Sequence, residues 1–123
     1  MKNYTKKLVM ASITAVIGML MLAVPVLAAT TATLSPATVN VTAGKQFNIA
    51  VSVNPQGSTN YAEKIEINYP AGLLEVSTFT FGSNWMALTQ PGYDSTDNIN
   101  GILIKTAGYP AGLSGATVFG TVT

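Results

Sequence analysis

The chain has 123 residues and contains no cysteine, no histidine and no arginine. Without cysteine it has no disulfides, no thiolate zinc sites and no thiol redox chemistry, and without histidine it lacks the usual metal ligand and the usual general base near neutral pH. Beyond residue 29, three dispersed lysines face five acidic residues, a formal charge of −2, so the clustered basic surface that a nucleic-acid-binding protein needs is excluded.

The first 29 residues form a segment that differs in kind from the rest. Three lysines among the first seven residues are followed by residues 8–29, which carry no charge. Pro25 and the small residues Ala28 and Ala29 then offer a cleavage site. This order predicts a helical signal peptide over residues 1–29, and therefore a secreted or cell-surface protein. Twenty-two uncharged residues are also long enough to span a bilayer, so a membrane anchor that stays attached is the open alternative.

Residues 30–123 are predicted to form one all-β domain. They are rich in Thr, Val, Ile, Ser, Asn and Gly, which favours strands and turns over helices. After a polar lead-in, residues 34–41 are expected to form a first strand with a kink at Pro36, followed by a turn at 42–45. The clearest strand spans residues 46–54, because apolar side chains alternate there with polar ones. The apolar members of this alternation are Phe47, Ile49, Val51 and Val53.

Further segments of strand character follow a loop at 55–60. Residues 64–69 alternate again, which predicts a second half-buried strand. Residues 74–76 and 79–81 are expected to form strands of opposite phase, with a bulge or break between them. A short apolar segment lies at 85–89.

The remainder is expected to contain a polar loop at 90–98, a strand at 102–104, a connection rich in Gly and Pro at 108–115 and a last strand at 118–123. Six or seven short strands with frequent turns predict an antiparallel β-sandwich of the jelly-roll or immunoglobulin-like kind. In this fold, apolar side chains at every second position from Phe47 onward point inward. Because the last strand runs to the end of the sequence, we also expect a fragment of a longer reading frame.

Four stretches of this domain, taken in order, resemble a cohesin domain of the divergent kind found in secreted and surface proteins. They are the stretch from Leu34-Ser35-Pro36 to Phe47, the run from Tyr69 to Val76, Gly101 to Ile104, and Gly115 to Val122. The resemblance covers roughly residues 32–123 and implies a jelly-roll sandwich shared with several carbohydrate-binding modules. Cohesins bind dockerin modules and so hold enzymes on scaffolds that degrade polysaccharide, which implies a dockerin-like partner here.

Two positions depart from the family pattern. Type I cohesins often place Asn and Asp on the strand before the Leu-Glu-Val turn, where these residues hydrogen-bond the dockerin. The same spacing reaches Ala62 and Lys64 in this chain. The resemblance therefore supplies no dockerin-binding residue at these two positions.

No catalytic, cofactor or metal site is predicted. Glu63 and Glu66 lie three positions apart on one strand and so point to opposite faces, which prevents them from acting as a glycosidase pair. Asp94 and Asp97 share a loop whose oxygen atoms suit calcium, but the loop lacks the order of acids and the closing glutamate of a calcium-binding loop. A solvated hairpin loop is the simpler interpretation, and we expect no enzyme.

Aromatic residues offer a carbohydrate-binding alternative. Trp85, Tyr61, Tyr93 and Tyr109 all fall in or beside predicted loops, where aromatic faces can stack on sugars. Trp85 can instead pack in the core beside Met86. Tyr93 and Tyr109 are expected to be exposed, because each neighbours a glycine or a proline.

A protein-binding face is the preferred prediction. Lys64, Glu66 and Asn68 project together from one strand. Asn48 and Ser52 project from another, and a shared face would join the two sets into a small polar patch suited to a modest interface. An ordinary solvated surface is the alternative.

The sequence as a whole therefore predicts a secreted, non-catalytic binding module that docks a dockerin-like protein. A carbohydrate-binding or adhesive module and a structural spacer stay open as alternatives.

Overall fold

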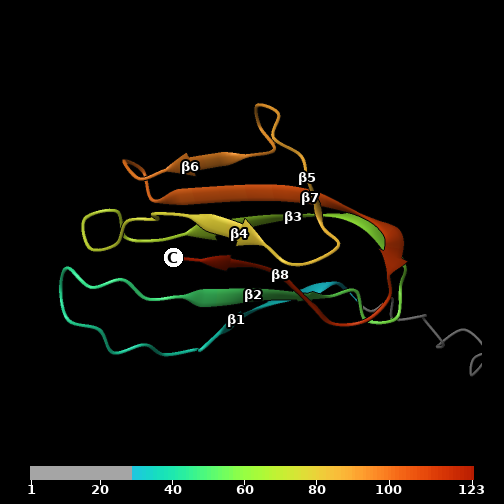
Figure 1. Ribbon diagram of the computed structural model, residues 1–123, viewed down its shortest axis with the longest axis horizontal. Helices are drawn as coiled ribbons and strands as arrows, with labels where there is room; N and C mark the ends of the chain where they lie inside the picture. The colour runs from blue at the N-terminus through green and yellow to red at the C-terminus, as the bar shows by residue number, and fades with distance from the viewer. Residues whose placement is uncertain (1–28) are drawn as a thin grey trace, which may run out of the picture.

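The structure, a computed structural model, describes residues 29–123, so the predicted signal helix lies outside the described residues apart from Ala29. The described chain is all-β and contains no helix (Figure 1). No membrane-spanning helix was found in that range. The eight strands are β1 (Thr31–Ser35), β2 (Ile49–Asn54), β3 (Asn60–Asn68), β4 (Phe79–Phe81), β5 (Met86–Ala87), β6 (Ser95–Asp97), β7 (Ile102–Leu113) and β8 (Thr117–Val122).

These strands form two antiparallel sheets. The first sheet has the order β1-β2-β8-β4, and the second has the order β3-β7-β5, with β6 also pairing with β7. The strand β7 is central in the second sheet, because β3 pairs along one edge of it while β6 and β5 share the other edge. Within the described chain, β1 and β3 each pair with one strand only.

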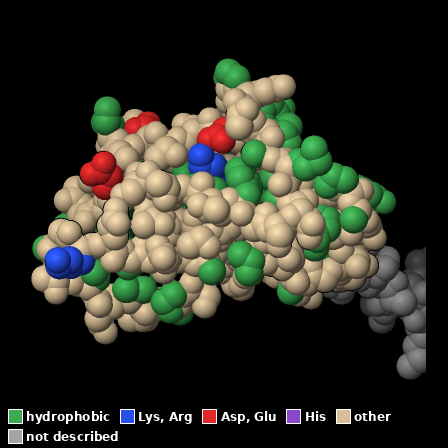
Figure 2. Space-filling view, in the orientation of Figure 1, with side chains coloured by type: hydrophobic (Ala, Val, Ile, Leu, Met, Phe, Trp, Pro, Cys, Tyr) green, Lys and Arg blue, Asp and Glu red, His purple; other side chains and the backbone are tan. Residues whose placement is uncertain are grey.

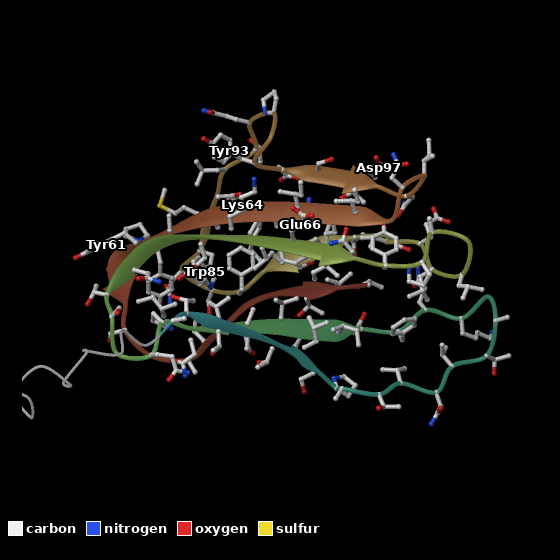
Figure 3. All side chains as sticks on the ribbon, turned by 180° about the vertical axis from the view of Figure 1, so that it is seen from behind. Tyr61, Lys64, Glu66, Trp85, Tyr93 and Asp97 are labelled. Atoms are coloured by element: carbon white, nitrogen blue, oxygen red, sulfur yellow. The ribbon has the colours of Figure 1, made fainter. Side chains whose placement is uncertain are left out.

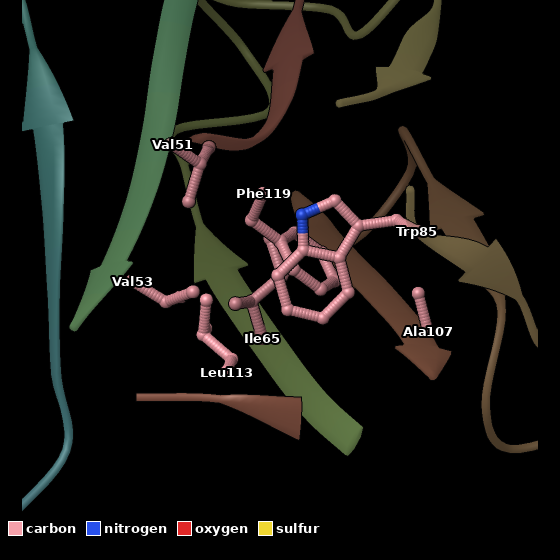
Figure 4. Close-up of a cluster of buried hydrophobic side chains, with 7 residues drawn as sticks. All are labelled: Val51, Val53, Ile65, Trp85, Ala107, Leu113 and Phe119. Atoms are coloured by element: carbon pink, nitrogen blue, oxygen red, sulfur yellow. The ribbon is translucent and has the colours of Figure 1, made fainter. Parts of the chain in front are cut away.

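The inward faces of the two sheets pack against each other around one apolar core (Figure 4). The alternation in β2 puts Val51 and Val53 inside, as predicted, and both are almost fully buried. Phe119 of β8 is also fully buried, with its ring edge-on to those of Phe81 and Trp85. From β3 and β7 the same cluster receives Ile65, Ala107 and Leu113.

The first strand lies earlier than the sequence predicts. It occupies Thr31–Ser35, and no strand covers residues 39–41. The pairing explains the difference, because β1 pairs with β2 along its whole length and the chain then leaves the sheet at Pro36, which has no N–H to donate. The turn predicted at 42–45 is confirmed, with a 3.1 Å backbone hydrogen bond across it.

The strand β7 is much longer than predicted, because the expected connection at 108–115 continues it for most of its length. Gly108 and Pro110 disfavour a strand by themselves. Gly108 nevertheless pairs with Ala62 on one side and Met86 on the other, and Leu113 pairs with Asn60, with a register shift between the two positions. The partner strands override the local propensity.

Two shorter segments also differ from the prediction. Residues 74–76 form no strand, and Val76 is held instead by the side chain of Asn98, which both donates to and accepts from its backbone. The predicted loop at 90–98 contains β6, because its last residues pair with the edge of β7. The predicted strands that the structure confirms most closely are those at 46–54, 64–69, 79–81 and 118–123.

Candidate functional site

The surface of the second sheet that faces away from the core, here called the outer face, carries most of the predicted binding residues. Ile65 of β3 is buried in the core, so its neighbours Lys64 and Glu66 point outward, and Asn68 follows them two residues later. The three side chains therefore share one face, as predicted. Their register partners on β7, which point the same way, are Thr106, Ile104 and Ile102.

Asn48 and Ser52 do not belong to this face, so the combined patch predicted from the sequence is wrong. Ser52 lies on β2 of the first sheet, and Asn48 immediately precedes that strand. The loop at 55–59 carries the chain from the first sheet to the second. The carboxamide oxygen of Asn48 accepts a hydrogen bond from the hydroxyl of Thr123 at 2.9 Å, so it takes part in closing its own sheet.

Alternation also places two isoleucines where the sequence did not predict them. If every second apolar residue from Phe47 onward pointed inward, Ile102 and Ile104 would mark the buried side of β7. The structure shows the reverse, because Leu103 between them is fully buried and the two isoleucines, which are half-buried, lie on the outer face. Residues 102–104 are all apolar, so the sequence alone does not show which of them point inward.

The loop between β5 and β6 reaches the outer face beside Lys64. The ammonium of Lys64 donates to the carbonyl of Gly92 at 3.2 Å and lies 5.9 Å from the centroid of the Tyr93 ring, within cation–π range. Tyr93 is 46% exposed, as expected. Figure 3 shows Tyr93 on this loop above Lys64 and Glu66. These contacts hold the loop against one border of the outer face.

Thr106 supplies a polar group that sequence reasoning missed. It sits opposite Lys64 in the register and is only 6% exposed. Its side-chain oxygen is buried, and no described residue gives it a hydrogen bond. A buried hydroxyl without a partner costs free energy. The hydroxyl of Thr106 therefore lies unpaired beneath the outer face of the described chain.

The two aspartates of the acidic loop are held by neighbouring side chains and backbone groups. The carboxylate of Asp94 pairs at 2.5 Å with Lys105, which points inward and lies 5.8 Å from the Phe79 ring centroid. Asp97 accepts hydrogen bonds from the side chain of Asn100 and from the backbone N–H groups of Asn100 and Ile99, and these bonds lower the pKa of its carboxyl. Residues 29–123 contain no group of three His, Cys, Asp or Glu that could hold a metal ion.

The two glutamates of β3 are separated by the sheet, as predicted. Glu66 points outward, whereas Glu63 is half-buried on the inward side and accepts a 2.7 Å hydrogen bond from the side chain of Asn60. The two carboxyls therefore lie on opposite sides of the sheet and do not flank a common space in which a glycosidic bond could lie.

The aromatic residues do not form a sugar platform centred on Trp85. The indole is 8% exposed and donates to the carbonyl of Val118 at 2.9 Å, so the alternative in which Trp85 packs in the core is confirmed. Its ring lies edge-on to those of Phe119 and Tyr109, with centroids 4.8 and 4.9 Å away. The expectation that Tyr109 is exposed is wrong, because its ring packs half-buried on Trp85.

Tyr61 is the most exposed of the candidate aromatic side chains, at 64%. Figure 3 places it at one end of the sheets, away from the loop that carries Tyr93. A sugar-binding surface built on both tyrosines would have to span this separation.

No family model, curated protein or solved structure matches the chain. The function is therefore argued from the geometry of the outer face together with the sequence motifs.

Proposed function

We propose that this chain is a non-catalytic binding module that docks another protein through the outer face of its second sheet. The observation that carries the proposal is the composition of that face: the half-buried Ile102 and Ile104 lie beside the exposed, oppositely charged residues Lys64 and Glu66. An apolar centre with a polar rim is the usual anatomy of a protein–protein interface.

Lys64 and Glu66 give the outer face one residue of each charge sign. The described residues carry three lysines and five acids, and two of these eight stand together on the outward side of β3. Figure 2 shows few charged side chains on its visible face. Lys64 and Glu66 would orient a partner that carries complementary charges. Charged residues at the rim of an interface steer the approach of the partner and fix the register in which it binds.

The resemblance to cohesins supports a dockerin-like module as the partner, on a jelly-roll sandwich, in a secreted or cell-surface assembly that acts on polysaccharide. In this proposal Lys64 stands where type I cohesins often carry an amide or an acid. Recognition would then depend on the Lys64 and Glu66 charge pair rather than on the hydrogen-bonding side chains of type I members.

A carbohydrate-binding role is the second candidate, and the exposure of Tyr93 beside Lys64 is the observation that favours it. An aromatic ring stacks on a sugar only where its face is free, and Tyr93 is the exposed aromatic residue nearest to the outer face. The burial of Trp85 removes the largest aromatic surface from this role.

The double exchange Lys64→Glu/Glu66→Lys tests the docking proposal, because it conserves composition and net charge. We expect binding to a purified dockerin module, measured by surface plasmon resonance, to weaken about tenfold or more, since like charges then face each other across the interface. The matched control is Lys45→Glu/Glu75→Lys, an exchange of the same kind away from the outer face, which should leave binding unchanged.

Equal affinity of the wild type and the Lys64/Glu66 exchange would contradict docking through this face. Retention on insoluble polysaccharide that Tyr93→Ala abolishes would favour the carbohydrate-binding candidate instead.

A further inference from the structure

A groove opens between the two sheets at the end of the molecule where β3 finishes. Its volume is about 520 Å³, and both sheets contribute to its wall. The side chains that form the wall are mainly apolar. They include Leu34 of β1, Ile49 of β2, Ile67 of β3, Val122 of β8, and Phe47 and Leu74 of the connecting segments.

The groove exists because nothing in the described chain covers the inward side of β1. Leu34 pairs in register with Val51, which is in the core, so Leu34 also points inward. Nevertheless Leu34 is 48% exposed, and all five residues of β1 are exposed. Among residues 29–123, no strand of the second sheet therefore lies opposite β1.

No described strand pairs with the other edge of β3 on the same side. Among the strands that the structure describes, β3 pairs with β7 alone, so every second residue along it directs its N–H and C=O away from the sheet. Ile65 packs in one cluster with Val51 and Val53 of β2, which places β3 over β2. A strand added to the free edge of β3 would consequently lie over β1.

We propose that this groove takes up an extended peptide strand, which pairs with the free edge of β3 and places alternate apolar side chains over Leu34. Such strand addition uses main-chain hydrogen bonds for affinity and side-chain pockets for specificity. The open edge supplies the hydrogen bonds, and the groove supplies the pocket. This site lies at the edge of β3 and between the sheets; it shares Lys64 and Glu66 with the outer face but does not depend on the docking proposal.

The charges of β3 specify the partner further. Lys64 and Glu66 lie on the outward side of the edge strand, so the added strand should carry an acid opposite Lys64 and a base opposite Glu66. An antiparallel copy of β3 itself, centred on Ile65, meets this requirement, because its own glutamate and lysine then face Lys64 and Glu66. The preferred ligand is therefore an antiparallel strand of the pattern Lys-apolar-Glu.

A second folded copy of the chain does not fit this site in that register. The two-fold axis that pairs β3 with its copy would place β2 of the second molecule where β1 of the first already lies, because β3 sits over β2 in each. The occupant we infer is an extended peptide segment rather than a folded copy.

The test uses a fluorescent ten-residue peptide with the sequence of residues 60–69, titrated with the full chain and followed by anisotropy. We expect saturable binding. A peptide with proline at the position of Ile65 should not bind, because proline removes a ladder hydrogen bond. The variant Leu34→Lys should weaken binding at least about tenfold, since it places a charge in the groove. Its matched control is Ile99→Lys, because Ile99 is 89% exposed and is not among the groove residues.

Charge exchange tests the register. A peptide with the lysine and glutamate of β3 interchanged should bind the wild type about threefold to tenfold more weakly, and binding should recover with the Lys64→Glu/Glu66→Lys variant. Hydrogen exchange at the β3 amides should also slow when the peptide binds.

The proposal is overturned if the peptide does not bind, if the proline peptide binds equally well, or if Leu34→Lys leaves affinity unchanged. A dimer in sedimentation that Leu34→Lys dissociates would also overturn it, because a second copy would then be the occupant.

Discussion

The two ends of the interior differ in how completely they are closed. At one end Trp85 and Phe119 meet edge-on, and Leu113 of β7 adds to a sealed cluster. At the other end Leu34 and Phe47 line an open groove, although they belong to the same apolar pattern. The two ends show that an inward-pointing side chain is buried only where a strand of the opposite sheet lies over it.

The open end is held by polar contacts instead. The side chain of Asn98 accepts hydrogen bonds from the Tyr69 hydroxyl at 2.5 Å and from the Val76 N–H at 2.9 Å, and it donates to the Val76 carbonyl at 3.1 Å. Burial is the main cause that raises the pKa of the Tyr69 phenol, and the nearby carboxylates of Asp97 and Glu75 add to it. This network fixes the segment that forms one wall of the groove.

Truncating one apolar residue at each end should show the largest contrast. Leu113→Ala removes a buried side chain at the closed end and should lower the free energy of unfolding by about 2–5 kcal/mol. Leu34→Ala, at a position that is half in water, should cost about 1 kcal/mol or less. Urea denaturation of the two variants measures both values, and equal losses would contradict the difference between the ends.

Removing the polar network should have an intermediate effect. Asn98→Ala deletes three hydrogen bonds and should lower the free energy of unfolding by about 2–3 kcal/mol. Asn100→Ala is the matched control, since its side chain bonds only to the carboxylate of Asp97 in the described structure, and it should cost about 1 kcal/mol or less. Thermal unfolding followed by circular dichroism measures the two losses. If Asn98→Ala were no more damaging than its control, the network would not hold the open end.

The sequence predicts correctly those strands in which apolar and polar residues alternate without interruption. The prediction fails where pairing with another strand, rather than the local sequence, keeps a segment in the sheet. Residues 46–54 alternate cleanly, and β2 follows that pattern. The sequence of residues 108–113 predicts a connection, and the pairing of Gly108 with β3 and β5 and of Leu113 with β3 keeps this stretch in β7. No local signal reports such a partner, because the residues concerned are far apart in the chain.

The candidate site could be predicted in part for the same reason. Lys64, Glu66 and Asn68 share a face by the period of one strand, so their grouping follows from the sequence alone. Ile104 and Thr106 join them only through the register between β3 and β7. The groove depends on the absence, among the described residues, of a strand above β1. The sequence of β1 alone gives no sign of that absence.

Amide hydrogen exchange along β3 tests most directly the claim that one side of the second sheet is open. We predict that alternate amides between Ile65 and Asn68 exchange slowly, because they donate to β7, and that the amides between them exchange quickly at the free edge. Amides of β7 from Ile102 to Ile104, which have a strand on each side, should be slow throughout. Uniform protection along β3 would contradict the account, because it would show that its edge is already covered.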